Sequence, residues 1–324
     1  MLFLKRMSAL VGLVLLAASC TGSNAGDDRP GTTVPSTPAT TAETTAVSIA
    51  VAFPVTIQAG NGPVVLEQRP SAIVSLSPTA TEMLFAVGAG DQVIAVDEYS
   101  TFPVNAPVTD LSGFTPNFEA IAAYEPDLVI ISNDIEDMVA TLGALNIPVL
   151  LMPAVLTIDE VFTQIDQIGA ATGHRTEAAE LVELLAVDLE SIVAGLPVMD
   201  EPLTYYHELD PTFYSVTSST FIGHVYSLLG LVNIADPADV DGFGYPQLSV
   251  EHIVSADPDL IFVTDCCGES LESVAARPGW ENISAVQTGS VVVVDDDIAS
   301  RWGPRTIEFL ASVAANVAEL RAGG

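Results

Sequence analysis

The chain contains 324 residues, of which 49% are hydrophobic and 16% are charged. This apolar content is enough for two compact cores and excludes a disordered chain. With 42 acidic and 9 basic residues the formal net charge is −33, which excludes partners that require clustered Lys and Arg, such as nucleic acid or an anionic membrane surface. Lys5 is the only lysine, so any basic site further along the chain must use arginine.

Residues 1–19 have the pattern of a secretory signal peptide. Lys5 and Arg6 precede an apolar run at residues 9–18, which is too short to span a bilayer, and small residues precede Cys20. A cysteine at this place resembles the bacterial lipoprotein signal. The resemblance implies that lipid on Cys20 anchors the mature protein to the outer face of the cell membrane. An ordinary cleaved signal with an incidental cysteine is the alternative.

Residues 20–47 are rich in Thr and Pro and contain almost nothing that could be buried. This composition predicts a disordered tether behind the lipid anchor. As a flexible coil, such a segment would span about 30 Å on average. We therefore expect a folded body that is held near a membrane and is free to turn.

From residue 48 onward, short apolar runs alternate with helical patterns. The runs lie at residues 72–76, 92–96, 127–132 and 147–152, and the helical patterns lie at 79–89, 117–124 and 134–145. This alternation indicates a parallel sheet covered on both faces. It recurs at residues 203–206, 259–264 and 290–295 and in a closing helix near 304–321. The sequence therefore predicts two α/β lobes of Rossmann-like character, at residues 48–172 and 198–324.

A long helical stripe lies between the two predicted lobes. Apolar residues recur from 178 to 196 at helical spacing, and Gly195 and Pro197 end the pattern. A helix of this length would run about 36 Å. We expect one rigid helix at residues 173–197 to join the lobes, with a ligand cleft between them that closes only slightly.

The two halves share a short repeat. Glu119 is followed seven residues later by Pro126 and Asp127 at the start of an apolar run, and Glu251 is followed at the same spacing by Pro258 and Asp259. Either copy alone is a common sequence between a helix and a strand of α/β proteins. Matched spacing in both halves predicts two glutamates at equivalent surface positions of similar lobes.

Ligands of open α/β sheets bind beyond the carboxyl ends of the strands, and the loops at these places hold most of the tyrosines. Such rings suit the walls of a cleft for a large, flat, partly apolar ligand, although each could instead cap the core of its lobe. Arg301 could pair with Asp297 or present its donors to a ligand. His207 could ligate a metal, but no second His or Cys lies at ligand spacing, which favours a hydrogen-bonded wall residue.

The cysteines at 266 and 267 follow an apolar strand and could form a vicinal disulfide or remain two small apolar residues. The motifs of serine hydrolases, zinc proteases, phosphate-binding loops and β-lactamases are absent from the sequence. We therefore expect no enzyme, and an extracytoplasmic enzyme on the same scaffold is the less favoured alternative.

With these residues in view, the chain from about Arg69 to Arg321 resembles the class III periplasmic binding proteins, whose two lobes are linked by one helix and which serve ABC importers of cobalamin, haem and ferric siderophores. It is most similar to the cobalamin-binding members. The matching stretches are residues 72–78 with Thr81 and Glu82, residues 99–103, 117–130 and 245–251, and Arg301 with residues 304–305.

The resemblance implies roles for individual residues. Glu119 and Glu251 match two lobe-tip glutamates that dock into arginine pockets on the two permease subunits. His207 takes the place of a cleft phenylalanine, and it or a tyrosine could bind iron if the ligand were haem. The remaining residues that fall at cleft contacts of the cobalamin binders are Tyr99, Phe114, Phe213, Tyr245, Asp297 and Arg301.

Charge ranks the ligands that the resemblance allows. Ferric tricatecholates and oxyanions would favour several cationic groups, whereas only Arg301 and Arg305 are available. A near-neutral corrinoid fits best, haem second and a hydroxamate ferric siderophore third. We expect a monomeric, extracytoplasmic, lipid-anchored protein without a cofactor of its own, which delivers this ligand to a permease dimer and its ATPase.

Overall fold

The computed structural model describes residues 52–197 and 201–323, without the side chains of Cys266 and of residues 321–323. The predicted signal peptide, Cys20 and the whole predicted tether lie outside the described residues. Residues 47–324 form one compact unit, to which the following description is confined. Among the described residues, no helix has the length and apolar character needed to cross a membrane.

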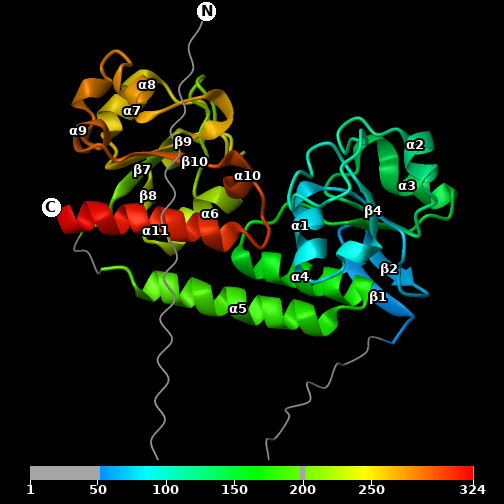
Figure 1. Ribbon diagram of the computed structural model, residues 1–324. Helices are drawn as coiled ribbons and strands as arrows, with labels where there is room; N and C mark the ends of the chain where they lie inside the picture. The colour runs from blue at the N-terminus through cyan, green and yellow to red at the C-terminus, as the bar shows by residue number, and fades with distance from the viewer. Residues whose placement is uncertain (1–51, 198–200, 324) are drawn as a thin grey trace, which may run out of the picture. The chain divides into compact units, whose positions relative to one another are not determined.

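The N-terminal lobe contains a four-stranded parallel sheet in the order β4-β3-β5-β6 (Figure 1). All residues of β3 and β5 are buried, as expected for a sheet covered on both faces. The elements of this lobe are β3 (Ile73–Leu76), α1 (Pro78–Ala86), β4 (Val93–Val96), α2 (Phe118–Ala122), β5 (Leu128–Ile131), α3 (Met138–Ala144) and β6 (Val149–Leu151).

The C-terminal lobe contains a second parallel sheet, in the order β10-β9-β7-β8. Its strands and first helices are β7 (Thr204–Glu208), α6 (Phe221–Leu228), β8 (Val232–Asn233), α7 (Val250–Ala256), β9 (Leu260–Thr264) and α8 (Leu271–Ala275). They are followed by α9 (Ser284–Thr288), β10 (Val291–Val294), α10 (Asp296–Ala299) and α11 (Thr306–Gly323). In both lobes the second strand lies beside the first, and the third and fourth follow on its other side. The prediction of two parallel α/β lobes is confirmed.

Several elements were not predicted from the sequence. These include an antiparallel hairpin of β1 (Val55–Ala59) and β2 (Gly62–Leu66), the short strand β8, helix α4 (Ile158–Thr172) and the short helices α8, α9 and α10. Short 3-10 turns lie at η1 (Gly90–Gln92), η2 (Ile135–Asp137), η3 (Asp236–Ala238), η4 (Asp265–Cys267) and η5 (Trp280–Asn282). The helix predicted from residue 134 begins only at Met138, because Glu136 and Asp137 have positive φ of 55° and 56°.

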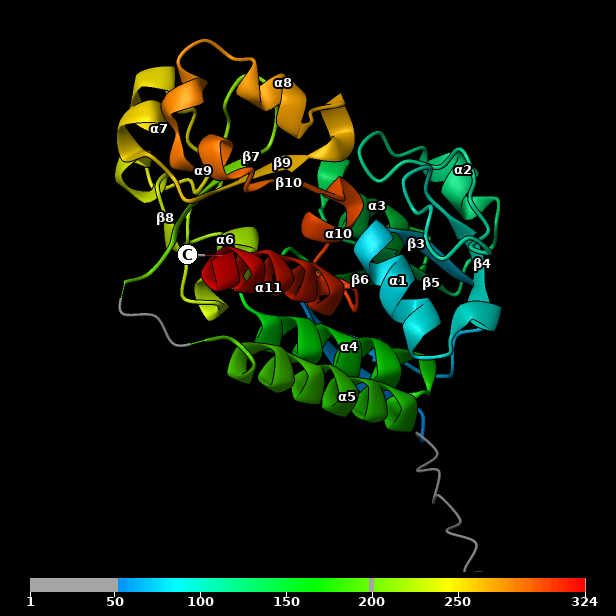
Figure 2. The same cartoon turned by 60° about the vertical axis from the view of Figure 1, so that its left-hand side comes forward.

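Helix α4 packs along α5 (Arg175–Ala194), which occupies most of the predicted linker range, and α11 packs on α5 as well (Figures 1 and 2). The α4–α5 approach is close, since a Cβ at Gly169 would lie only 2.3 Å from the Cβ of Ala178. A capping box of Thr157 and Glu160 begins α4, and Gly173 ends it with φ of 83°. Helix α5 therefore joins the lobes in the predicted range, and α4 and α11 pack along it.

The hydrophobic core does not divide cleanly between the lobes. One cluster of buried residues runs from the N-terminal sheet through α4, α5 and α11 to the C-terminal sheet, and each lobe has a second cluster of its own on the other face. Moving one lobe against the other would disturb close-packed side chains in the shared cluster. This continuity opposes a wide opening motion.

The sequence repeat has the same structural meaning in both lobes. The Asp127 carboxylate accepts hydrogen bonds from the backbone N–H groups of Ser71 and Ala72 at 2.8 and 2.9 Å, and from the Ser71 hydroxyl at 2.9 Å. The Asp259 carboxylate accepts from the N–H and hydroxyl of Thr204 at 2.8 and 2.9 Å. Each aspartate thus ties the start of the third strand of its lobe to the start of the first.

Candidate ligand-binding site between the lobes

Two aromatic rings from the loops after β4 form an exposed pair in the N-terminal lobe. Tyr99 and Phe114 are 51% and 60% exposed, and their ring centroids lie 5.8 Å apart at an interplanar angle of 82°. This edge-to-face arrangement is a favourable geometry for aromatic pairs. The loop segments are joined by a hydrogen bond from the Glu98 N–H to the Leu111 carbonyl at 2.9 Å. The structure therefore brings together two of the predicted ligand contacts.

Tyr245 is presented by a tight loop of the C-terminal lobe. The Asp239 carboxylate accepts from the Gly244 N–H at 2.8 Å, and the Thr217 N–H donates to the Gly244 carbonyl at 2.8 Å. Gly244 has φ of 82°, and a Cβ there would lie 2.7 Å from Cγ2 of Thr220, so the close approach requires glycine. Tyr245 remains 51% exposed, although partial burial raises the pKa of its hydroxyl.

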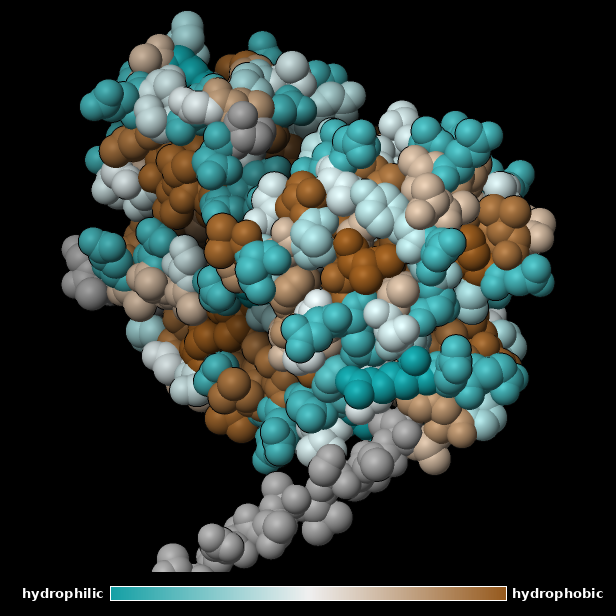
Figure 3. Space-filling model, turned by 45° about the vertical axis from the view of Figure 1, so that its right-hand side comes forward, coloured by the Kyte–Doolittle hydropathy of each residue, from teal (hydrophilic) through white to brown (hydrophobic). Residues whose placement is uncertain are grey.

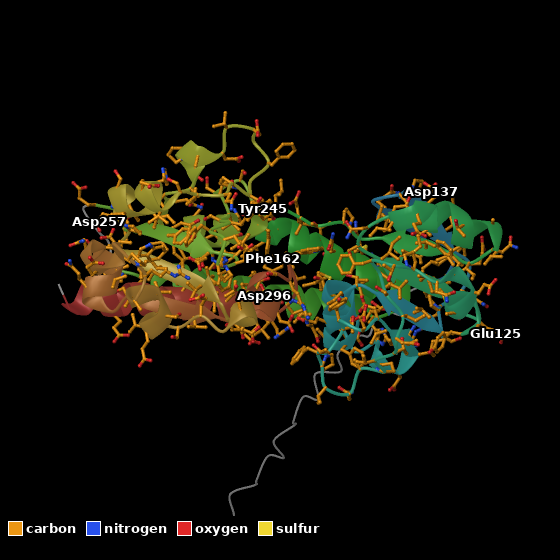
Figure 4. The ribbon with its side chains drawn as sticks, turned by 90° about the horizontal axis from the view of Figure 1, so that it is seen from above. Glu125, Asp137, Phe162, Tyr245, Asp257 and Asp296 are labelled. Atoms are coloured by element: carbon orange, nitrogen blue, oxygen red, sulfur yellow. The ribbon has the colours of Figure 1, made fainter. Side chains whose placement is uncertain are left out.

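Figure 4 labels Tyr245 together with Phe162 of α4 and Asp296 of α10 near the middle of the view, where the two lobes face each other. Tyr245 is thus a C-terminal ring on the side of its lobe that faces the N-terminal lobe. Figure 3 shows that one face of the molecule carries hydrophobic side chains in separate patches within a largely hydrophilic surface.

Arg301 contacts both lobes. Its Nη1 donates to Oε1 of Glu82 at 3.1 Å, and its Nη2 donates to the Tyr99 carbonyl at 3.0 Å and to Oδ1 of Asp297 at 2.6 Å. The local pair with Asp297 is therefore present, as the spacing of four residues allows. These bonds use three of the five N–H donors of the guanidinium. In this structure most of the donor capacity of Arg301 is committed to the protein.

Arg305 binds the same glutamate from the start of α11. Its Nε and Nη2 donate to the two carboxylate oxygens of Glu82 at 2.9 and 2.6 Å, and this bond is the main cause that raises the Arg305 pKa. Its guanidinium carbon lies 4.3 Å from the ring centroid of Phe102. Beside it opens a hollow of about 340 Å³, lined by Glu82, Phe85, Ala86, Phe102, Pro103, Asn105, Pro304 and Arg305.

A buried polar cluster lies behind the Tyr99 loop. The Ser100 hydroxyl donates to Oδ1 of Asp97 at 2.5 Å, and Oδ2 of Asp97 has no hydrogen-bond partner among the described residues. Burial raises the Asp97 pKa, while the bonds from Ser100 and the charge of Arg301 act in the opposite direction. The Thr81 hydroxyl lies 2.9 Å from those of Ser75 and Ser100, which extends the cluster to β3. The cluster fixes the loop that carries Tyr99.

His207 does not line the site. Its side chain is fully buried in the C-terminal lobe, where Nδ1 lies 2.8 Å from the Tyr226 hydroxyl. Burial lowers the His207 pKa to about 3, so the imidazole is neutral near pH 7. We correct the expectation that His207 contacts the ligand or serves as an axial metal ligand, because its position on β7 directs the side chain into the lobe interior.

Phe213 is only partly buried and packs on residues of its own lobe. Its ring is partly buried against Trp280, with centroids 6.0 Å apart, and the guanidinium carbon of Arg277 lies 5.6 Å from the Phe213 centroid. Arg277 in turn donates to both oxygens of Glu208 at 2.6 Å. The Phe213 ring therefore packs beside an internal ion pair of its own lobe and keeps part of its surface exposed, so its assignment as a ligand contact stays a prediction.

Glu119 and Glu251 occupy equivalent exposed positions. Each is the second residue of a short helix, α2 or α7, whose first turn is capped by Asn117 or Ser249 through a hydrogen bond of 3.1 Å. Six residues after each glutamate the chain has positive φ, 52° at Glu125 and 47° at Asp257. Figure 4 labels these two residues at opposite ends of the two lobes. The geometry that the repeat predicted is present.

The residue that sequence reasoning left without a role is Glu82. Its side chain is 2% exposed, and its carboxylate is bound by Arg301 and Arg305. The available signal was a lone acid within the otherwise uncharged pattern at residues 79–89. Its partners lie more than two hundred residues away, so no local spacing could identify them.

Among the described residues, no group of three or more His, Cys, Asp and Glu side chains could hold a metal ion. The side chain of Cys266 is not among those described, so the vicinal disulfide stays a prediction. What the site offers is therefore exposed aromatic surface beside a set of paired charges.

Known proteins similar to this chain agree with the fold. A family model described as periplasmic binding protein matches residues 73–298. YvrC, an ABC transporter substrate-binding lipoprotein of Bacillus subtilis, is 32% identical over 275 residues, which cover 82% of this chain and 86% of the relative. A cobalamin-binding protein of Halobacterium salinarum is 34% identical over 279 residues, with 82% and 74% covered.

A solved structure shows the same architecture. The periplasmic vitamin B12-binding protein of Vibrio cholerae is similar with a TM-score of 0.64 and 27% identity, over 78% of this chain and 98% of that one. The family match spans both sheets and the helices between them. From the match, the relatives and the fold together it follows that the chain belongs to the periplasmic binding proteins, the solute-binding components of ABC importers.

Proposed function

We propose that this binding protein captures a corrinoid outside the cytoplasm and delivers it to the permease of an ABC importer. The observation that carries the proposal is the exposed Tyr99–Phe114 pair, which lies against paired charges and not against a free cation. Rings of this kind can pack on the apolar parts of a large macrocycle. Tyr245 supplies a further ring from the other lobe.

The charges beside the rings favour a ligand that is nearly neutral. Arg301 and Arg305 are matched by Glu82 and Asp297, so the four groups together carry no net charge. A ferric tricatecholate or an oxyanion would have to break these pairs to find a cation. Haem fits this site less well than a corrinoid. Its carboxylates would meet arginines that are already paired, and His207 is buried where it could not bind the haem iron.

The relatives support the ligand class. The Halobacterium salinarum protein is named for cobalamin and the Vibrio cholerae protein for vitamin B12. Both share the two-lobe family to which this chain belongs. We extend that ligand class to this chain on the strength of its own exposed rings and neutral ion cluster.

Delivery would use Glu119 and Glu251. Both glutamates are exposed in the first turn of equivalent helices, one on each lobe. A monomer with two equivalent acidic points matches a permease built from two similar subunits and coupled to an ATPase. Lipid on Cys20 would keep the protein at the membrane, a role consistent with the lipoprotein name of YvrC.

Ligand identity is tested by titrating the full chain with cobalamin, cobinamide, hemin and a ferric hydroxamate, followed by absorbance and native mass spectrometry. We expect one corrinoid per chain and no turnover. Tyr99→Ala and Tyr245→Ala should each raise the cobalamin Kd about tenfold or more, as expected from the loss of a buried aromatic contact. Tyr124→Ala removes an exposed ring that follows α2 and serves as the matched control. Uptake of hemin alone, or of none of the four, would refute the corrinoid assignment.

Docking is tested with the double variant Glu119→Gln and Glu251→Gln. Transport of labelled cobalamin into cells should be lost while the Kd of the purified protein stays unchanged. The control pair Glu125→Gln and Glu272→Gln removes one exposed glutamate from each lobe at unrelated positions. Equal loss of transport in both double variants would show that net charge matters and the two positions do not.

Anchoring is tested separately with Cys20→Ser. The variant should lose incorporation of labelled fatty acid and should be released from the membrane fraction. Full labelling in Cys20→Ser would remove the anchor from the proposal and leave the ligand and docking assignments intact.

A further inference from the structure

The segment at residues 301–305, between α10 and α11, is where the C-terminal lobe binds the N-terminal lobe through polar contacts. Arg301, Trp302 and Arg305 all make hydrogen bonds to the N-terminal lobe or to α4. Two of the three side chains end on one carboxylate, that of Glu82. We propose that Glu82 is a positioning residue that fixes the spacing of the lobes and thereby orients the side chains that contact the ligand.

The placement of Glu82 supports a role between the lobes. It lies on α1, which packs on β3 and α4 of the N-terminal side, whereas both of its arginine partners follow α10 of the C-terminal lobe. The segment approaches α1 closely, since a Cβ at Gly303 would lie 3.6 Å from Oε2 of Glu82. The side chains of Glu82, Arg301 and Arg305 are 2%, 11% and 13% exposed, so solvent screens their charges little.

Glu82 is linked to the candidate ligand contact Tyr99 through Arg301. The Arg301 guanidinium, which binds Glu82, also donates to the Tyr99 carbonyl at 3.0 Å and to Asp297 at 2.6 Å. Tyr99 in turn meets Phe114 edge to face. Loss of the Glu82 charge would leave two nearly buried arginines with Asp297 as their remaining carboxylate partner, and we expect Arg301 to turn away from the Tyr99 loop. A change at Glu82 should therefore alter the orientation of the Tyr99 and Phe114 rings.

The C-terminal lobe provides a matched control. Glu208 is 1% exposed and binds both terminal nitrogens of Arg277 at 2.6 Å, so it is as buried and as tightly paired as Glu82. Its partner Arg277 belongs to its own lobe, as does Glu269, which also binds Arg277. Glu82→Gln and Glu208→Gln therefore remove the same charge from similar surroundings, but only the first weakens a contact between lobes.

The lobe spacing is measured without any ligand. Spin labels on p-acetylphenylalanine at Ala140 and Ser255 mark exposed positions of α3 and α7 and leave the native cysteines untouched. In the full chain in detergent, we expect the pulsed-EPR distance distribution to broaden or shift in Glu82→Gln and to match the unmodified protein in Glu208→Gln. An unchanged distribution in Glu82→Gln, or equal changes in both variants, would overturn the proposal.

The consequence for binding rests on the proposed function and is measured as a second arm. Cobalamin Kd should rise about tenfold in Glu82→Gln and less than twofold in Glu208→Gln. If the unmodified protein does not bind cobalamin, the ligand assignment fails while the distance measurement still decides the role of Glu82. If Glu82→Gln does not fold, Arg305→Gln replaces it. Because Arg301 still binds Glu82 in that variant, we expect a smaller change in the distance distribution. An unchanged distribution in Arg305→Gln would also overturn the proposal.

Discussion

The two lobes share their strand order and the aspartate that ties the third strand to the first, yet they treat buried polar groups differently. In the C-terminal lobe, Glu208 is paired with Arg277, and His207 lies against Tyr226, all within the same lobe. In the N-terminal lobe, the buried acid Glu82 is paired with arginines of the other lobe. The C-terminal lobe satisfies its own buried charge, whereas the N-terminal lobe is electrostatically complete only when the two are joined.

The largest effect should follow from removing Arg277. Arg277→Met leaves Glu208 buried without its cation, and breaking a buried pair in this way typically costs about 3 to 5 kcal/mol of unfolding free energy. Arg305→Met should cost less, because Arg301 still neutralises Glu82. Urea unfolding of the two variants measures the difference. A larger loss in Arg305→Met would contradict the view that the C-terminal lobe depends on one internal pair.

Close packing of α4 on α5 gives a second comparison. Gly169→Ala would place a methyl group 2.3 Å from the Cβ of Ala178 and 2.9 Å from the carbonyl oxygen of His174, so we expect a loss of about 1 to 3 kcal/mol. Gly143→Ala on α3 has no atom within 4 Å of the added carbon and should be neutral or slightly stabilising. Thermal or urea unfolding decides this, and tolerance of Gly169→Ala would show that the helix pair can separate freely.

The pH dependence of stability should arise partly from one lobe. His207 and Ser75 are equivalent positions on the first strands of their lobes, because each lies three residues after a residue whose backbone N–H binds Asp259 or Asp127. Only the C-terminal lobe therefore has a titratable side chain at this buried position. Burial lowers the pKa of the folded His207 imidazole to about 3, so this imidazole stays neutral in the folded protein. In the unfolded protein the same imidazole gains a proton below about pH 6.5. This contribution is fully present above that pH and is lost on acidification.

Between pH 7 and pH 5 the His207 contribution should lower the unfolding free energy by about 2 kcal/mol. His207→Gln should remove this part of the pH dependence while keeping a polar partner for Tyr226. The shifts at His174, His224 and Asp97 remain in both proteins and cancel in the comparison. Identical pH profiles for the two proteins would mean that His207 takes up a proton in the folded state.

The smallest effect concerns the two capped helices of the repeat. Asn117→Ala and Ser249→Ala each remove one side-chain bond to the first turn and should cost about 1 kcal/mol each. Hydrogen exchange of α2 and α7 should accelerate by similar factors, since the caps are equivalent. Unequal acceleration would show that one lobe supports its exposed glutamate more firmly than the other.

The sequence predicted the strands well, because buried parallel strands are short continuous apolar runs such as residues 127–132 and 259–264. It failed for α4, although Thr157 and Glu160 formed a capping box and Gly173 marked the end of the helix. The hairpin of β1 and β2 was missed as well, although residues 55–59 alternate between apolar and polar side chains and the turn at residues 60–62 is rich in glycine.

For the site, the sequence predicted the positions of loops better than the direction of side chains. Tyr99, Phe114 and Tyr245 are exposed as expected and Phe213 is partly buried, whereas His207 faces the interior of its lobe. One residue of difference along a strand reverses the direction of a side chain, and no composition argument resolves it. The pairing of Glu82 with Arg301 and Arg305 depends on the packing of two lobes and could not be read from either segment alone.

The binding of Arg301 and Arg305 to Glu82 has a consequence for proteolysis of the folded body. Beyond Lys5 the chain has no lysine, so trypsin can act only after arginine, and Arg69 and Arg277 each precede a proline that hinders cleavage. Arg175 is exposed at the start of α5, whereas Arg301 and Arg305 are nearly buried in their bonds to Glu82. Cleavage after Arg301 or Arg305 would therefore require this segment to leave the N-terminal lobe, and its rate would report how often the two lobes come apart.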